Sequence, residues 1–441
     1  MVVLGLGSNL GDRLQHLQRA LREIFENSKM RCSRVFLSGV YESKALLPKG
    51  APRDWDKPFL NMAVRAETSL HPAELLFEIK QIEKKMGRET RKQWAPREID
   101  IDILALDQKI IHSDNLSIPH PGLLERSFAL RPFSEVANDW VYPVVGPQFG
   151  KSPAQILSET SFENDAIKMI DHFSSSGWVG ILNITPDSFS DGEKYRETPQ
   201  ALARARQLAA AGAAVLDLGA ESTRPGARGV PAEEEWGRLE PVLESLVKNK
   251  SKSVWSPCIS VDTRKWEVAK KALEAGADWI NDVTGLEDPK MRQVLADSHC
   301  DVVMMHHLGV PPTNSQIIPR DLDPVSHLLL WAESRLNLAE KSGIHRSRII
   351  FDPGIGFGKT AEQSLDILFH IRRFRELGVR LLVGHSRKSF LKIFGEELAE
   401  KRDPETSAIS EHLVKSGVDY IRVHNLESNI QSCKAAMAFW T

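Results

Sequence analysis

Residues 211–220 read AGAAVLDLGA, and this short stretch decides how the second half of the chain folds. The glycine at position 212 ends a helical pattern, as a left-handed residue after a helix commonly does. A short apolar run follows and closes on polar residues, which is typical of a buried strand. The same order recurs at residues 275–283, 377–384 and 416–424. The repetition predicts alternating helices and parallel strands.

Eight strands of this kind are expected within residues 176–441, each followed by a helical pattern. They lie at residues 179–183, 215–219, 259–262, 279–283, 301–306, 349–352, 381–384 and 420–424. Eight β/α units in about 260 residues is the size of an α/β TIM (β/α)8 barrel. A doubly wound sheet is the alternative, but the count of eight favours a closed barrel.

Residues 1–145 follow a different pattern. Strand patterns at 2–8, 35–41, 59–66 and 99–106 alternate with helical patterns at 11–27 and 72–86. The order strand–helix–strand–strand–helix–strand is that of an α+β ferredoxin-like domain. Residues 107–145 are expected to complete this domain. Residues 146–175 contain Pro, Gly and Ser with only a weak helical pattern, and are expected to form a linker to the barrel.

The overall composition limits the classes of function. The 441 residues contain 57 Lys plus Arg and 59 Asp plus Glu, which gives a net charge of −2. This balance argues against binding nucleic acid or an anionic membrane by bulk charge. The four cysteines are scattered, no apolar run approaches the ~18 residues of a membrane span, and the N-terminal residues enter a strand pattern at once. We therefore expect a cytoplasmic protein with no nucleic-acid or membrane partner.

Acidic and apolar residues alternate in residues 98–103, EIDIDI. Successive side chains of a strand point to opposite faces, so Asp100 and Asp102 share the face away from the isoleucines, about 6–7 Å apart. Two carboxylates so placed can hold a pair of Mg²⁺ ions, which neutralise a polyphosphate during in-line displacement. A solvated strand face is the simpler interpretation of an isolated Asp-x-Asp.

Basic residues just before this strand favour the metal interpretation. They are Arg88, Arg91, Lys92 and Arg97. A basic loop alone is usually just solvated, but beside two carboxylates it suits a triphosphate–metal complex. Trp94 interrupts the run, where its ring can act as a lid over a flat ligand.

These motifs resemble the family of 6-hydroxymethyl-7,8-dihydropterin pyrophosphokinase. The matching segments are residues 6–11 (LGSNLG), 59–61 (FLN), 87–102 (GRETRKQWAPREIDID), 118–121 (IPHP) and 125–128 (ERSF). The resemblance covers residues 1–145. It implies that the hydroxymethyl oxygen of the pterin attacks the β-phosphorus of ATP, so that pyrophosphate is transferred and AMP is released.

The resemblance also implies roles for individual residues. Asp100 and Asp102 would hold two Mg²⁺ ions, and the implied catalytic set is completed by Arg88 and Arg97. The implied ATP contacts are Glu83, Arg88, Arg97 and His120, and the implied pterin contacts are Phe59, Asn61, Trp94 and Phe128. Asn115 departs from the family, which often has an arginine there. The basic set around ATP is therefore incomplete or supplied from elsewhere.

Polar residues gather at the ends of the expected barrel strands, where the active sites of such barrels lie. They are Asn183, Asp217, Asp262, Asn281, His306, Asp352, residues 386–388, Arg422 and His424. Any one of them could have a structural role, but burying so many is costly unless they are paired. The group as a whole indicates function.

Two kinds of ligand fit these strand ends. Phosphate often binds after strands seven and eight of such barrels, so this end fits a pyrophosphate leaving group. The cationic cluster there consists of Lys388, Arg422 and His424. Donors and acceptors for a nitrogen-rich heterocycle are offered by Asp262, Asn281 and Asp352.

Residues 352–360, DPGIGFGKT, nearly spell a P-loop, but Pro353 stands where the first glycine is required. Proline lacks the backbone N–H and the permissive dihedral angles on which a phosphate cradle depends. We therefore reject a nucleotide-binding loop at this position.

The barrel motifs resemble the dihydropteroate synthase family. The matching segments are residues 180–192, 221–226, 261–263, 281–285, 352–360, 386–389 and 422–424. His307 departs, because the family usually has methionine there. The resemblance covers residues 175–441. It implies that p-aminobenzoate displaces pyrophosphate from a dihydropterin-methyl pyrophosphate whose methylene becomes cationic.

The second resemblance implies a further set of contacts. The pterin contacts would be Asp262, Asn281, Asp352 and Lys388; the pyrophosphate contacts would be Asn183, Arg224, Arg422 and His424; the p-aminobenzoate contacts would be Phe189, Thr223, Pro225 and Ser389. Asn183 would also help to bind one Mg²⁺ ion. The implied catalytic residues are Lys388, Arg422 and His424.

The two halves agree, because the first would make the pyrophosphate ester that the second consumes. We expect a bifunctional transferase of folate biosynthesis with ATP, hydroxymethyldihydropterin and p-aminobenzoate as substrates. A homodimer through the barrel helices is implied by the family. The alternatives are a barrel like the pterin-dependent methyltransferases, which would not need residues 386–388, and a pterin-binding protein with one inactive half.

Overall fold

The computed structural model describes residues 1–87, 94–162, 165–170, 173, 176–184, 194–221, 229–250, 257–313 and 316–439, without the side chains of Glu26 and of residues 194–197. The chain divides into two compact units. The first comprises Met1–Ser175 with Ile430–Thr441, and the second comprises Ser176–Asn429.

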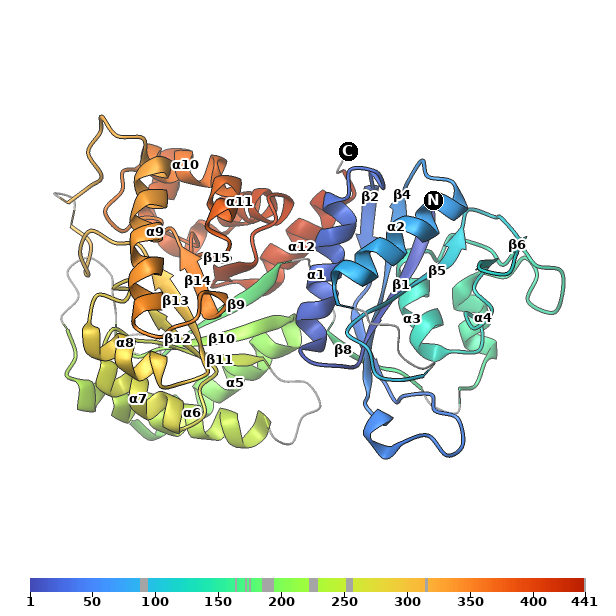
Figure 1. Cartoon of the computed structure of the whole chain (residues 1–441), viewed down its shortest axis with the longest axis horizontal. Helices are drawn as coiled ribbons and strands as arrows, with labels where there is room; N and C mark the ends of the chain where they lie inside the picture. The colour runs from blue at the N-terminus through green and yellow to red at the C-terminus, as the bar shows by residue number, and fades with distance from the viewer. Residues whose placement is uncertain are drawn as a thin grey trace. The chain divides into compact units, whose positions relative to one another are not determined.

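The first unit is built on one sheet with the order β5-β1-β4-β3-β8, in which β2 also pairs with β4. Its strands are β1 (Val2–Ser8), β2 (Ser33–Leu37), β3 (Val40–Ser43), β4 (Phe59–Glu67), β5 (Asp100–Leu106) and β8 (Ile167–Ile170). The pairs β1–β4 and β1–β5 are antiparallel. This arrangement confirms the ferredoxin-like α+β fold and places β5 beside β1 (Figure 1).

Four helices pack on this sheet or beside it. They are α1 (Arg13–Glu26), α2 (Pro72–Lys85), α3 (Ser127–Val136) and α4 (Pro153–Glu159). Helix α1 contacts β1, α2 contacts β5 and α3 contacts β4. A buried core that includes Val3, Ala63, Phe133 and Ile156 joins α3 and α4 to the strands. A short 3-10 turn, η1 (Arg53–Trp55), and the small hairpin of β6 (Ile111–His112) and β7 (Ser117–Ile118) complete the unit.

The expected strand at residues 35–41 is divided into β2 and β3. Leu37 and Tyr41 are four positions apart, whereas their partners on β4, Val64 and Asn61, are only three positions apart. The extra residue forms a bulge. Ser38 lies in this bulge, and its Oγ accepts a backbone N–H of β4 at 2.8 Å.

The structure differs from the expected linker over much of residues 146–175. Helix α4 and strand β8 lie in this segment, and β8 pairs antiparallel with β3. Ile156 and Ile170 are both buried. Apolar side chains at these positions lose contact with water on packing, so the segment belongs to the first unit rather than to a free connection.

The second unit is a closed barrel of eight parallel strands in the order β10-β11-β12-β13-β14-β15-β16-β9. The strands are β9 (Gly177–Asn183), β10 (Ala213–Gly219), β11 (Cys258–Asp262), β12 (Trp279–Asp282), β13 (Asp301–Met305), β14 (Ile349–Asp352), β15 (Arg380–Val383) and β16 (Tyr420–Val423). Each overlaps one of the eight expected strands. The TIM barrel is therefore confirmed, and the carboxyl ends of its strands meet at one mouth.

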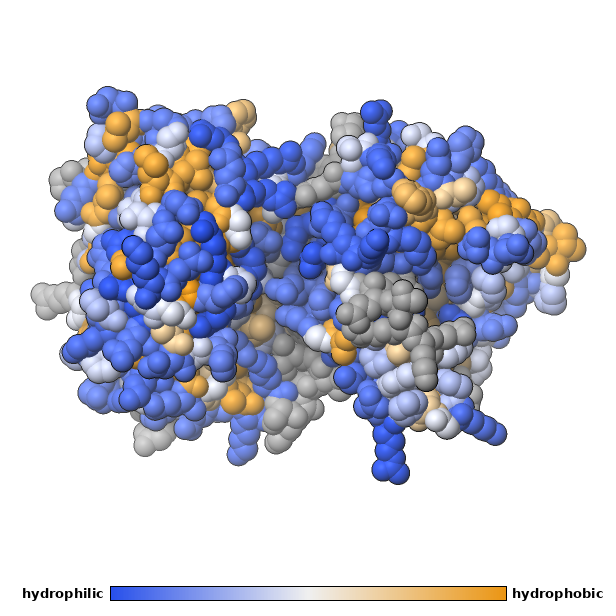
Figure 2. All heavy atoms as spheres, in the orientation of Figure 1, coloured by the Kyte–Doolittle hydropathy of each residue, from blue (hydrophilic) through white to orange (hydrophobic). Residues whose placement is uncertain are grey.

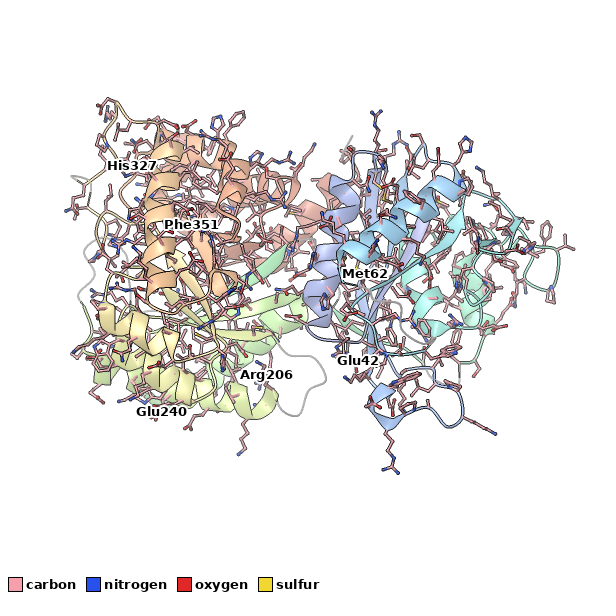
Figure 3. All side chains as sticks on the ribbon, in the orientation of Figure 1. Glu42, Met62, Arg206, Glu240, His327 and Phe351 are labelled. Atoms are coloured by element: carbon pink, nitrogen blue, oxygen red, sulfur yellow. The ribbon has the colours of Figure 1, made fainter. Side chains whose placement is uncertain are left out.

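Helices follow the barrel strands in the expected alternation (Figure 1). They are α5 (Lys194–Ala211), α6 (Ala232–Lys250), α7 (Trp266–Glu274), α8 (Pro289–Ala296), α9 (Pro324–Lys341), α10 (Ala361–Phe369), α11 (Asp403–Lys415) and α12 (Leu426–Met437). Short 3-10 helices, η3 (Arg346–Arg348), η4 (Ile371–Leu377), η5 (Ser389–Phe394) and η6 (Ala399–Lys401), lie between them. Phe351 of β14, labelled in Figure 3, packs against the rings of Trp331 and Phe374 at centroid distances of 6.4 and 5.5 Å.

The drawn face is hydrophilic over much of its area, with hydrophobic residues gathered over α9 and α10 (Figure 2). Leu330 of α9 and Phe369 of α10 expose 76% and 73% of their surface. Among the described helices, none is long and apolar enough to cross a membrane.

Candidate active sites

A cavity of about 320 Å³ in the first unit opens beside β1, β4 and β5. Eight residues singled out in the sequence line it, and they come from four separate segments. They are Phe59, Asn61, Trp94, Arg97, Asp100, Asp102, His120 and Phe128. The fold therefore brings the expected acidic, basic and aromatic residues into one place.

Asp100 and Asp102 form the acidic end of this cavity. Nη1 of Arg97 lies 3.1 Å from Oδ2 of Asp100, and Nε2 of His120 lies 4.0 Å from Oδ2 of Asp102. Desolvation in the cavity, together with the charge of Asp100, raises the pKa of Asp102 to about 6. Two carboxylates that disfavour each other's charge suit a divalent cation, and oxygen ligands are those that Mg²⁺ prefers. The donor set therefore fits magnesium.

Asn61 and two phenylalanines form the other end. Asn61 is buried, and its Nδ2 donates to Oγ of Ser43 at 3.0 Å. A Cβ atom at Gly7 would lie 3.3 Å from Oδ1 of Asn61 and 3.5 Å from the ring of Phe59. The glycine of the LGSNLG motif thus leaves room beside both side chains. The guanidinium carbon of Arg126 lies over the ring of Phe128, 6.0 Å from the centroid of that ring.

Glu83, an expected ATP contact, is buried and contacts the strand that carries the two aspartates. It does not line the cavity, and it is 1% exposed. Its Oε1 accepts the backbone N–H of Ile101 at 2.9 Å, and its Oε2 lies 2.8 Å from Nζ of Lys80. Glu83 therefore supports the strand between the two aspartates, and its contact with ATP stays a prediction.

Some lining residues escaped the sequence reasoning, and one expected residue falls outside the described structure. Lys44, Lys80 and Arg126 all line the cavity. A signal existed for Lys80, which lies one helical turn before Glu83 on α2. Arg88, like the rest of residues 88–93, lies outside the described residues.

At the mouth of the barrel, one arginine joins two carboxylates. Nε of Arg422 donates to Oδ2 of Asp217 at 2.6 Å, and Nη2 donates to Oδ2 of Asp262 at 2.9 Å. Asn281 adds a bond from Nδ2 to Oδ2 of Asp217 at 3.2 Å. Asp217 was noted only as a polar strand end, yet it is 1% exposed and links Arg422 to Asn281. The interior charges are thus paired, as burial requires.

Burial shifts the titration of three groups around this mouth. It raises the pKa of Asp262 to about 7, although Arg422 opposes the shift. It also raises the pKa of Asp352, whose Oδ1 accepts the N–H of Gly354 at 2.7 Å. Burial lowers the pKa of Lys388 to about 8. Acidic and basic groups that titrate near neutrality are common at catalytic sites.

The loop after β14 carries the near-P-loop, and it turns its lysine inward. Lys359 is 8% exposed and its Nζ lies 2.8 Å from Nδ1 of His306. Lys388 instead approaches this loop from outside. Its Nζ donates to the carbonyl oxygen of Ile355 at 2.5 Å and lies 4.8 Å from the ring centroid of Phe357.

The other expected residues of the barrel lie around this mouth or outside the described structure. Nδ1 of His424 lies 3.0 Å from Oγ of Ser386. Oδ1 of Asn183 would lie 3.8 Å from a Cβ atom at Gly219, which faces Asp262 as well. Ser389 begins η5 and is exposed. Four more residues expected at this site lie outside the described residues: Phe189, Thr223, Arg224 and Pro225.

Two family models match the chain, one for each unit. The model of 7,8-dihydro-6-hydroxymethylpterin-pyrophosphokinase matches residues 3–138, and that of pterin binding enzymes matches residues 179–424. The folate synthesis bifunctional protein of Chlamydia trachomatis is 37% identical over 99% of this chain and 97% of its own length. The mitochondrial folate synthesis bifunctional protein of Arabidopsis thaliana is also 37% identical, over 99% of this chain and 82% of its own.

Solved structures match the barrel. The dihydropteroate synthase of Anaplasma phagocytophilum, with bound 6-hydroxymethylpterin-monophosphate, is 36% identical with a TM-score of 0.54 and covers 59% of this chain and 98% of its own. The Xanthomonas albilineans enzyme with 4-aminobenzoic acid is 38% identical with a TM-score of 0.54 and covers 60% and 92%. With a pyrophosphokinase domain, a pterin-binding synthase barrel and full-length relatives that carry both, the chain belongs to the family of bifunctional folate synthesis enzymes.

Proposed function

We propose how the described residues carry out the two consecutive reactions of this family. The first unit transfers pyrophosphate from ATP to 6-hydroxymethyl-7,8-dihydropterin and releases AMP. The second joins the resulting ester to p-aminobenzoate, which gives 7,8-dihydropteroate and releases pyrophosphate. The observation that carries the proposal is the cavity that joins the Asp100–Asp102 pair to Asn61 and its aromatic neighbours.

In the first reaction, the chain binds and orients two substrates. Asn61 would hydrogen-bond the pterin between the rings of Phe59 and Phe128, with Trp94 as a lid. Arg97 and His120, with Arg88, would contact the nucleotide. Asp100 and Asp102 would hold two Mg²⁺ ions, which when bound neutralise the triphosphate charge. The pterin oxygen forms a bond to the β-phosphorus as the bond from that phosphorus to the AMP oxygen, in line with it, breaks, and the hydroxyl proton passes to water.

In the second reaction, the barrel mouth holds the pterin ester and stabilises positive charge on its methylene. Asp262, Asn281 and Asp352 would pair with the amide and amidine edges of the pterin, beside Lys388. The amine nitrogen of p-aminobenzoate bonds to the methylene carbon as the carbon–oxygen bond to pyrophosphate breaks.

The leaving pyrophosphate and p-aminobenzoate would be held at the rim. The pyrophosphate contacts would be Asn183, Arg224, Arg422 and His424, with one Mg²⁺ ion at Asn183. Arg422 engages two carboxylates through Nε and Nη2, so we assign its Nη1 to the leaving group. The p-aminobenzoate contacts would be Phe189, Thr223, Pro225 and Ser389.

Two finer properties complete the proposal. None of the four cysteines, all of which lie within the described residues, forms a disulfide, which supports a reducing compartment such as the cytoplasm. The exposed Leu330 and Phe369 on the barrel helices support a homodimer, which light scattering of the purified protein would test.

Separate assays of the two reactions test the proposed function. The full chain should release AMP from ATP and hydroxymethyldihydropterin. It should also form dihydropteroate from supplied pterin pyrophosphate and p-aminobenzoate. If dihydropteroate is not formed, the result favours a methyltransferase-like barrel or a protein whose synthase half is inactive. If AMP is not released, the result favours a protein whose kinase half is inactive.

A further inference from the structure

Lys80 lies at the acidic end of the first cavity. Its side chain is 47% exposed, while that of its ion-pair partner Glu83 is 2% exposed. Lys80 lines the cavity together with Asp100 and Asp102.

Glu83 fixes where this ammonium lies. One carboxylate oxygen is 2.8 Å from Nζ of Lys80, and the other accepts the N–H of Ile101 at 2.9 Å. That N–H belongs to the residue between the two aspartates. A single buried carboxylate therefore contacts both β5 and Lys80.

The other described cations of the cavity have different neighbours. Arg97 pairs with Asp100 at 3.1 Å. Arg126 lies over the ring of Phe128. Lys44 follows Ser43, which accepts a hydrogen bond from Asn61. Lys44 is thus at the end that we assign to the pterin. An ammonium has three N–H donors, and Glu83 engages one side of that of Lys80.

We propose that Lys80 binds the triphosphate of ATP, an inference that rests on the kinase reaction proposed above. A polyanion beside two aspartates needs cations around it, and lysine serves phosphate as a point charge. Lys80 supplies from α2 a positive charge that Asn115 does not provide. Glu83 then acts on the nucleotide through Lys80 and is a positioning residue.

The test compares three variants of the full chain: Lys80→Met, Lys80→Arg and Lys84→Met. Lys84 is an exposed lysine on the same helix and serves as the matched control. AMP release is measured against ATP concentration at saturating hydroxymethyldihydropterin. Loss of one charge-assisted hydrogen bond should raise the KM for ATP about tenfold in Lys80→Met.

The remaining readouts separate binding from folding. In Lys80→Met, the KM for the pterin should stay unchanged. The Lys80→Arg variant should keep a KM for ATP close to that of the wild type. The Lys84→Met control should match the wild type in both values. Dihydropteroate formation from supplied pterin pyrophosphate should be equal in all of them. An unchanged KM for ATP in Lys80→Met, or an equal rise in Lys84→Met, overturns the proposal. A wild-type chain that releases no AMP contradicts the kinase reaction itself.

Discussion

Nζ of Lys359 lies 2.8 Å from Nδ1 of His306, beneath the loop that joins β14 to α10. The same nitrogen donates to the carbonyl oxygens of Gly354 at 2.9 Å and Phe357 at 3.0 Å. Burial lowers the pKa of His306 to about 2 and also lowers the pKa of Lys359, so the imidazole is neutral and its Nδ1 can accept a hydrogen bond from Nζ of Lys359. The lysine of the near-P-loop thus closes its own loop instead of facing a phosphate.

Lys359→Met should impair the synthase and spare the kinase. Nδ1 of His306 and the carbonyl oxygen of Phe357 would lose their donor, at about 1–3 kcal/mol for each one left unsatisfied, while the carbonyl oxygen of Gly354 would keep the backbone N–H of Phe357. The loop also carries Ile355 and Phe357, on which Lys388 rests, so the pterin end of the barrel site should be displaced. The KM for pterin pyrophosphate should rise about tenfold or more, since 1.4 kcal/mol is tenfold in affinity.

Calorimetry and the two assays check this prediction. The melting temperature of the synthase unit should fall, and AMP release should not change. Lys341→Met, which removes an exposed lysine at the end of α9, is the control and should leave both activities and the melting temperature unchanged. Wild-type synthase kinetics in Lys359→Met would show that the closed loop does not position the site.

The synthase should have a bell-shaped pH profile. Asp262 has a pKa of about 7, raised by burial and by Asp217, Glu235 and Asp282 and opposed by Arg422, so its charge is lost as the pH falls through that value. Lys388 has a pKa of about 8, lowered by burial and by Arg422 and opposed by Asp352 and Asp262, so its charge is lost as the pH rises. If both charged forms are required, activity peaks between the two values.

The measurement is kcat/KM for dihydropteroate formation from supplied pterin pyrophosphate on both sides of this window. Lys388→Arg should move the alkaline limb to higher pH, because a guanidinium stays charged there. A flat wild-type profile, or an alkaline limb that is unchanged in the variant, would show that these groups do not control the reaction.

Period-two alternation and strand ends predicted much of both sites, because those signals are local in the sequence. Asp100 and Asp102 could be placed on one face from their spacing alone. The partner of a buried group could not be predicted in this way. Glu83 bonds to the backbone of Ile101, 18 residues later, and Asp217 bonds to Arg422, 205 residues later. For Lys80 the only signal was its place one helical turn before Glu83 on α2, because an exposed lysine on a helix is ordinary.

Asp100→Ala should abolish the first reaction alone. Removing one of the two carboxylates weakens the hold on Mg²⁺, which supplies several kcal/mol to the transition state, so AMP release should fall about a hundredfold or more. Dihydropteroate formation from supplied pterin pyrophosphate should not change, since the carboxylate belongs to the other unit. Asp114→Ala, at an exposed position between β6 and β7, should leave both activities intact. Loss of both activities in a folded Asp100→Ala chain would contradict independent sites.

Gly354→Ala should destabilise the barrel far more than Gly378→Ala. Both glycines have a left-handed backbone, with φ of +64° and +65°, so each alanine costs about 1–2 kcal/mol in conformation. At Gly354 the new Cβ would also lie 1.9 Å from the carbonyl oxygen of His306, whereas at Gly378 nothing lies within 4 Å. Because the clashing atom belongs to the backbone of His306, the clash can be relieved only if the loop that carries Gly354 and Lys359 moves. Urea unfolding should therefore show a larger loss of stability in Gly354→Ala than in Gly378→Ala, and synthase activity should be lost only in Gly354→Ala. Equal losses of stability in the two variants would show that the close approach to His306 is not what requires glycine at position 354.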